Sequence, residues 1–200
     1  MIALVRSEVY RLATIRSSWV SMALFAALGM LFGLLSADMW ALLAGVGAFG
    51  LAVMAVCQHH QHGTAVLLHL ARPRRTLVLA GQLVTVVLVT TAFAAVSGLL
   101  VLMGGEATQY GNTLLVVPVM AVFGAANAAV LRRSTYLFIG YSAWFVFIEG
   151  LLGKLAAPLP FSAYLLASAG ESDSMLILVG WSLLALVAAG IAIHRDVAGD

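Results

Sequence analysis

The stretch that decides the fold is WALLAGVGAFGLAVMAVC at residues 40–57, followed directly by QHHQHGTAVLLHLARPRRT at residues 58–76. The first segment carries no charge, and its length suits a helix across a bilayer core of ~30 Å, which needs ~20 residues. The second segment contains four histidines and three arginines. An apolar span that leads into a basic loop predicts an integral membrane protein with that loop on the cytoplasmic side.

The rest of the chain has the same character. Of its 200 residues, 63% are hydrophobic and only 9% are charged, whereas a soluble domain is about a quarter charged. Six apolar runs can be marked off, at residues 19–35, 40–57, 77–103, 113–131, 135–153 and 175–193. These runs lack the alternation of barrel strands. We therefore expect an all-α integral membrane protein, with six transmembrane helices in a single domain over residues 1–200.

The basic residues orient these six spans. With a cytoplasmic N-terminus, only Lys154 lies outside, and the other nine basic residues lie inside: Arg6, Arg11, Arg16, Arg72, Arg74, Arg75, Arg132, Arg133 and Arg195. The positive-inside rule thus predicts that both termini are cytoplasmic. The net charge of +2 then reflects topology, and we expect no nucleic-acid partner. The Ala, Val, Leu and Gly bias and the compact loops favour a bacterial cytoplasmic membrane.

Two segments are expected to lie along the membrane surface or to enter it partway. Residues 1–18 predict an amphipathic interfacial helix in which Arg11 and Arg16 can reach lipid phosphates; the alternative is a solvated basic flank of the first span. The outer segment at residues 154–174 is apolar but too short to cross and return. It predicts one or two short re-entrant helices, broken at Pro158 and Pro160, whose irregular backbone must be shielded by protein or face water.

The long inner loop at residues 58–76 predicts a short helix of its own. Gly63 breaks the helix that leaves the membrane, Thr64 can cap a new one, and Pro73 ends it. On this helix Leu67 and Leu70 share an apolar stripe with Val66. Such a stripe on the cytoplasmic side is expected to contact lipid or a partner protein.

Two polar residues within the predicted spans are candidates for function. Glu149 is the only carboxylate inside a span, and intramembrane carboxylates are functional candidates by default. Because Glu149 lies near the outer end of its span, we expect a packing, outer-gate or loop-anchoring role ahead of proton coupling. Asn127 is expected to make an interhelical hydrogen bond first and to contact a substrate second.

The histidines and the single cysteine add little chemistry. His59, His60, His62 and His69 could ligate a metal, but no carboxylate lies near them in the sequence, so we favour a polar helix end that gains charge in mild acid and expect no metal site. Cys57 has no partner for an internal disulfide. No phosphate-binding loop and no catalytic pair is found. We therefore expect no catalytic residue and no enzymatic activity in this chain.

The inner loop and the N-terminus carry a resemblance to a known family. Gly63-Thr64, Val66-Leu67-Leu68, Leu70 and Pro73-Arg74-Arg75 resemble the coupling region of type-2 ATP-binding-cassette (ABC) exporter permeases. Ser7-Glu8-Val9-Tyr10-Arg11-Leu12, followed by Arg16 and Trp19, is similar to the N-terminal connecting helix of that family. The family usually carries a glutamate before the Gly-Thr pair and a lysine at the start of the third span, where this chain has residues 58–62 and Gln82.

The resemblance implies partners and a mechanism. Two six-span permeases, identical or paired with a paralogue, would form the pathway in membrane lipid, and two copies of a separate ABC ATPase would bind ATP and Mg beneath them. This chain would hold no cofactor. The residues expected to couple to the ATPase are Gly63, Thr64, Leu67, Leu68, Leu70, Pro73, Arg74 and Arg75, with Glu8, Arg11 and Arg16 on the interfacial helix.

The function that the resemblance implies is ATP-driven export of hydrophobic or amphipathic small molecules or peptides, such as antibiotics, out of the cell. Glu149 and Asn127 are the candidates for its pathway or gate. Two alternatives stay open. One is a proton-coupled secondary carrier, which would favour buried carboxylates and inverted repeats. The other is a non-transporting membrane scaffold or sensor subunit.

Overall fold

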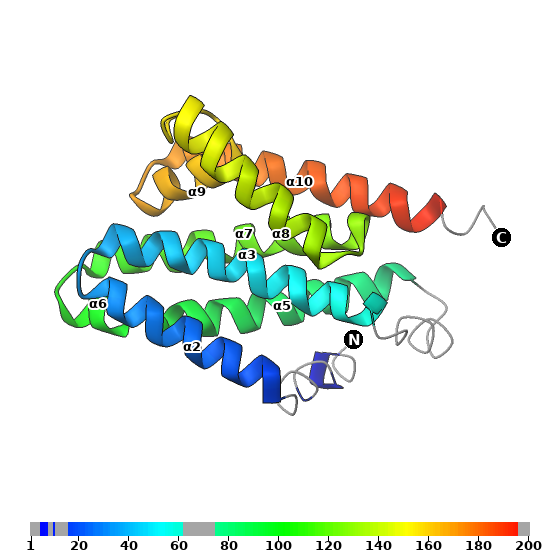
Figure 1. Cartoon of the computed structure of the whole chain (residues 1–200), viewed down its shortest axis with the longest axis horizontal. Helices are drawn as coiled ribbons and strands as arrows, with labels where there is room; N and C mark the ends of the chain where they lie inside the picture. The colour runs from blue at the N-terminus through cyan, green and yellow to red at the C-terminus, as the bar shows by residue number, and fades with distance from the viewer. Residues whose placement is uncertain (1–4, 8–9, 11–15, 62–74, 196–200) are drawn as a thin grey trace.

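The computed structural model describes residues 5–7, 10, 16–61 and 75–195, and these residues form helices and short turns with no strand among them (Figure 1). The all-α fold expected from the sequence is confirmed for this part of the chain. In chain order the helices are α2 (Arg16–Gly33), α3 (Ala37–Gln61), α5 (Arg75–Ser97), α6 (Leu99–Met103), α7 (Ala107–Leu131), α8 (Ser134–Ala143), the π-helix η1 (Trp144–Leu152), α9 (Pro160–Ser168) and α10 (Ser172–Arg195).

Five of the described helical stretches are long and apolar enough to cross a membrane: Ala37–Gln58, Leu77–Ser97, Ala107–Leu131, Ser134–Leu152 and Ser172–Ile193. They correspond to the second through sixth expected spans. The first expected span, 19–35, falls on α2, whose apolar part Met22–Gly33 is shorter than these five. The chain is thus compatible with a multi-pass membrane protein.

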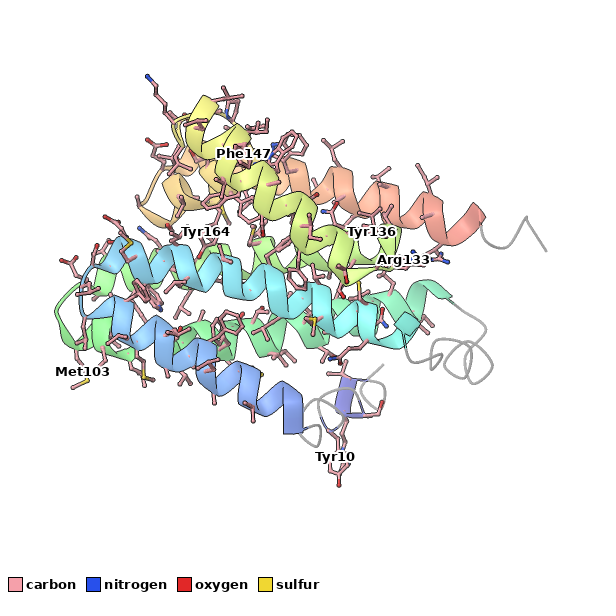
Figure 2. The ribbon with its side chains drawn as sticks, in the orientation of Figure 1. Tyr10, Met103, Arg133, Tyr136, Phe147 and Tyr164 are labelled. Atoms are coloured by element: carbon pink, nitrogen blue, oxygen red, sulfur yellow. The ribbon has the colours of Figure 1, made fainter. Side chains whose placement is uncertain are left out.

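The long helices lie side by side and alternate in direction (Figure 1). Helices α3, α7 and α10 end toward the right of Figure 1, and α2, α5 and α8 begin toward that side. The five basic positions that the structure describes at these helix ends, Arg16, Arg75, Arg132, Arg133 and Arg195, therefore gather toward one end of the bundle, which we call the basic end. Helix α9 lies toward the opposite end, and so does the turn that follows Met103 (Figures 1 and 2).

Helices α3 and α7 form the centre of the bundle because small residues let them approach closely. Ala44, Ala48 and Ala52 on α3 are buried. A methyl group on Gly124 of α7 would lie 3.0 Å from the backbone oxygen of Phe49 on α3. Helix α7 also packs against α5, α9 and α10, so the short α9 is surrounded by long helices.

The outward faces are apolar as well. Side chains on α8, η1 and α10 that are more than half exposed include Ile139, Val146, Phe147, Leu151, Leu183 and Val187. In water such a surface would be an aggregation hazard. In a bilayer it contacts lipid, which agrees with the hydropathy of these helices.

The third expected span, 77–103, is divided at Gly98 into α5 and α6. The indole of Trp40 lies against this glycine, where a methyl group would come within 2.2 Å of the ring. The indole N–H of Trp40 donates to Ser97 Oγ at 3.1 Å, and its ring stacks on Tyr110 at 5.6 Å. Gly98 therefore gives the space that this buried tryptophan needs between α3 and α5.

The segment after the fifth expected span contains one described helix, α9, within the one or two expected. Our expectation that Pro160 breaks a helix is wrong, since Pro160 is its first residue. Proline suits that position because its missing N–H would have no intrahelical partner there. Pro158 lies before the helix, and its carbonyl accepts a hydrogen bond from the Trp181 indole at 3.0 Å.

Candidate functional site

Glu149 is the central polar group in the half of the bundle opposite the basic end. It lies on η1 and is fully buried. Its Oε1 accepts hydrogen bonds from Trp144 Nε1 at 3.0 Å and from the Phe161 backbone N–H at 3.3 Å. Its Oε2 accepts from the backbone N–H of Ser162, and from Ser162 Oγ at 2.8 Å. Four donors therefore surround one carboxylate.

This carboxylate acts as the N-terminal cap of α9. Phe161 and Ser162 are the second and third residues of that helix, so their N–H groups have no intrahelical acceptor. Leu159, at the N-cap position, makes no side-chain capping bond, and Glu149 supplies the missing acceptors from η1. The negative charge also complements the positive end of the helix dipole. Among the roles expected for Glu149, these contacts match loop anchoring.

The π-helix explains how Glu149 reaches both of its neighbours. In η1 the backbone hydrogen bonds join residues five apart, as in the bond from Gly153 N–H to the Ile148 carbonyl at 2.7 Å. The same spacing separates Trp144 from Glu149. The indole can therefore donate to a carboxylate on its own helix while that carboxylate faces α9.

Helix α9 is also held from its other side. Tyr164 is almost completely buried, and its hydroxyl donates to the Ala41 carbonyl of α3 at 3.0 Å (Figure 2). The ring lies directly over Gly45, where a methyl group would come within 2.2 Å of Cε1. Burial raises the pKa of the Tyr164 phenol far above its usual range, so the hydroxyl stays neutral and remains a donor.

Asn127 of α7 forms a second polar pair nearer the basic end. Its Nδ2 donates to the Phe123 carbonyl at 2.8 Å, and its Oδ1 accepts from the Tyr141 hydroxyl of α8 at 2.9 Å. The interhelical hydrogen bond expected for Asn127 is thus present. The Tyr141 ring packs edge-on against Phe49 and Phe123, and Phe161 lies within the same aromatic group.

The Asn127–Tyr141 pair lines a cavity of about 350 Å³ between α7, α8, η1, α9 and α10, which we call the side cavity. Five aromatic residues line it: Phe123, Tyr136, Tyr141, Trp144 and Trp181. None of the described residues that line it is charged. At its basic end, the Arg133 guanidinium lies 5.7 Å from the centroid of the Tyr136 ring (Figure 2).

A second cavity, of about 410 Å³, lies between α2, α3 and α5 and reaches Phe138 of α8. Its lining is mostly aliphatic, and the Thr90 hydroxyl in its wall already donates to the Val86 carbonyl at 2.8 Å. Gly47 and Gly50 leave space on the α3 side. This cavity therefore offers volume with little polar chemistry.

The residues expected to couple to an ATPase lie almost entirely outside the described part of the chain. This applies to Gly63, Thr64, Leu67, Leu68, Leu70, Pro73 and Arg74, and also to Glu8 and Arg11. Arg75 is described as the first residue of α5, and Arg16 as the first residue of α2. Within the described residues, no group of three His, Cys, Asp or Glu side chains could hold a metal ion.

Sequence reasoning missed the partners of both polar groups. Ser162 and Trp144 are ordinary residues in apolar surroundings, and only the fold brings them to Glu149. Tyr141 carried one available signal, since a tyrosine within a span usually finds a hydrogen-bond partner when it is buried.

No protein-family model matches the chain, and no curated protein matches its sequence.

Proposed function

We propose that this chain is the membrane-spanning permease subunit of an ATP-driven ABC exporter. The observation that carries the proposal is the short helix α9, which lies among long apolar helices with its N-terminus capped by a buried carboxylate. A bilayer tolerates such an interrupted backbone only where protein shields it. Interrupted helices of this kind are typical of transport proteins.

The position of α9 supports a gate at the outer end of the bundle. It contacts α3, α7 and α10, so a relative movement of those helices would act on it directly. A change of state at the basic end can reach α9 through these long, packed helices. Any cargo or partner shifts this equilibrium only as far as it binds the two states differently.

The coupling partner follows from the sequence resemblance. Two ATPase subunits would dock at the basic end, on the helix expected after Thr64, and would bind and hydrolyse the ATP. Two copies of this permease, or one copy with a paralogue, would form the pathway in a bacterial cytoplasmic membrane, with six spans per copy. The cargo would be a hydrophobic or amphipathic small molecule or peptide.

Co-purification with the ATPase tests this proposal. The tagged chain is purified in mild detergent from its native host, and co-purifying proteins are identified by mass spectrometry. We expect a stoichiometric soluble ATPase with the unchanged chain. In the double variant Leu67→Asp and Leu70→Asp we expect its recovery to fall at least about tenfold, because two buried interface charges cost several kcal/mol.

The matched control is Ala65→Asp, which adds a charge to the opposite face of the same expected helix and should leave the ATPase bound. Equal membrane levels of all three chains show that insertion is unchanged. A preparation from intact membranes that contains no ATPase would contradict the exporter proposal and would favour the carrier or scaffold alternatives.

A further inference from the structure

The side cavity combines three properties that belong to a binding site. Its volume of about 350 Å³ falls in the range of ~300–1,000 Å³ typical of small-molecule sites. Aromatic rings from α7, α8, η1 and α10 line it. One polar pair, Asn127–Tyr141, lies in a mostly apolar wall.

The polar pair has hydrogen-bonding capacity left over. An asparagine amide has two N–H donors and a carbonyl acceptor. The described contacts use one N–H, toward the Phe123 carbonyl, and one acceptor position, toward the Tyr141 hydroxyl. The second N–H of Asn127 has no partner among the described residues, although the amide is half-buried at membrane depth. A donor in that position favours a ligand that carries an acceptor.

The lining also specifies charge and shape. None of the described lining residues is charged, and the Arg133 guanidinium lies only at the basic end, beside Tyr136. Farther in, an ion would lose its hydration without gaining a counter-charge, so a neutral ligand is favoured there. Ring faces and edges from five aromatic side chains favour flat aromatic groups. A plain acyl chain would use neither the rings nor the amide.

The polar pair lies toward the basic end of the side cavity. Asn127 lies four residues before the end of α7 at Leu131, which places it ~6 Å along the helix from the basic end. Tyr136 and Leu131 line the cavity near that end, and Trp181 and Pro160 line it farther in. The cavity therefore extends from the basic end toward the middle of the bundle.

We propose that the side cavity binds a neutral aromatic amphiphile whose hydrogen-bond acceptor pairs with the free N–H of Asn127. This inference deepens the exporter proposal, on which it rests for the role of the ligand as cargo. The ligand class is set by the cavity itself, through its uncharged lining, its rings and the second N–H of Asn127.

Equilibrium binding of two fluorescent probes to the purified, detergent-solubilised chain tests the site. Nile red is a neutral fused aromatic with a ring carbonyl, and pyrene is a neutral fused aromatic with no hydrogen-bonding group. We expect saturable binding of both. In Asn127→Leu the Kd of Nile red should rise about tenfold, because a buried hydrogen bond is lost. The Kd of pyrene should change less than about twofold, which also shows that this variant is folded.

A filling variant tests the location. Gly140 lines the side cavity, and a Cβ added there would meet no atom within 4 Å. The ring of Gly140→Phe should therefore occupy the cavity and abolish the binding of both probes. The matched control is Gly190→Phe on α10, which has the same open space but does not line this cavity, and it should bind both probes normally.

Two results would overturn the inference. Unchanged Nile red binding in Gly140→Phe would place the probe elsewhere, for example among bound lipids. An equal change of the Kd for Nile red and pyrene in Asn127→Leu would remove the hydrogen bond from the argument. Both measurements omit the ATPase, so a failure here leaves the exporter proposal intact, and a missing ATPase leaves the binding data intact.

Discussion

At the scale of single residues, Glu149 shows how a carboxylate is kept within an apolar bundle. A buried charge is costly unless it is paired or hydrogen-bonded, and here Trp144, Phe161 and Ser162 provide the donors. Hydrogen bonds to a charged group contribute about 1.5–3 kcal/mol each, more than neutral ones. The N-terminal cap of α9 thus depends on a single side chain.

We predict that Glu149→Gln destabilises the protein. The amide cannot accept at both positions, so one of its N–H groups would face the donors of Phe161 or Ser162. The free energy of unfolding should fall by about 2 kcal/mol, measured by SDS titration in mixed micelles. Glu106→Gln is the control, since that exposed residue precedes α7 without a side-chain capping bond, and its stability should not change. Equal stability of the two variants would contradict the anchoring role.

The sequence could predict where Glu149 lies but not what it binds. Its position near the outer end of an apolar run follows directly from the order of residues, and an anchoring role was among the expectations. Its partners are backbone N–H groups that become available only because α9 begins at Pro160. A proline in a loop indicates a break in a helix as readily as a start, so local sequence does not distinguish the two.

At the scale of helices, the packing of α9 and of α5 against α3 depends on glycines of α3. Gly45 lies beneath the Tyr164 ring of α9. A methyl group added to Gly47 would lie 2.8 Å from the Phe93 ring of α5. The hydropathy of residues 40–57 predicts the span and its small residues predict close approach. The sequence does not predict which ring packs against which glycine, because that depends on the rotation of each helix about its axis.

We predict that Gly45→Ala destabilises the protein by about 1–3 kcal/mol, because the added methyl group overpacks the contact with Tyr164. The hydrogen bond from Tyr164 to the Ala41 carbonyl would be disturbed at the same time. Gly180→Ala is the control, since no atom lies within 4 Å of the added carbon, and it should be neutral or stabilising by up to about 1 kcal/mol. Thermal unfolding of both variants in detergent measures the difference, and a stable Gly45→Ala would contradict the contact.

The helix type of η1 could not be predicted from the sequence either. Residues 144–152 are apolar and would suit an α-helix equally well by composition. The wider turn places Glu149 toward α9 and Trp144 next to Glu149. The helix type therefore depends on the contact between η1 and α9. The fifth apolar run therefore indicates a span correctly while its hydrogen-bond pattern follows from packing.

At the scale of the whole molecule, the arrangement of the helices agrees with the charge pattern. The basic positions at described helix ends gather toward one end, and α9 lies toward the other (Figure 1). Charge counting predicted this arrangement because a short loop joins two helix ends that lie on the same side. The number of membrane crossings by α2 and the side on which each terminus lies stay predictions.

We predict the orientation in cells from this arrangement. In a background with Cys57→Ala, which removes the single buried thiol, Ser172→Cys should react with a membrane-impermeant maleimide in intact cells. Thr135→Cys should react only after permeabilisation. Both residues are exposed in the structure, so accessibility differs only by side of the membrane. The reverse pattern would overturn the orientation.

Trp40 makes the end of the bundle opposite the basic end observable without an added label. The chain has four tryptophans, and among those whose side chains the structure describes, Trp40 alone is fully buried. It touches α5 at Gly98 and α7 at Tyr110. Because indole fluorescence shifts to longer wavelength when water reaches the ring, any separation of these helices would change the emission colour of the unmodified protein.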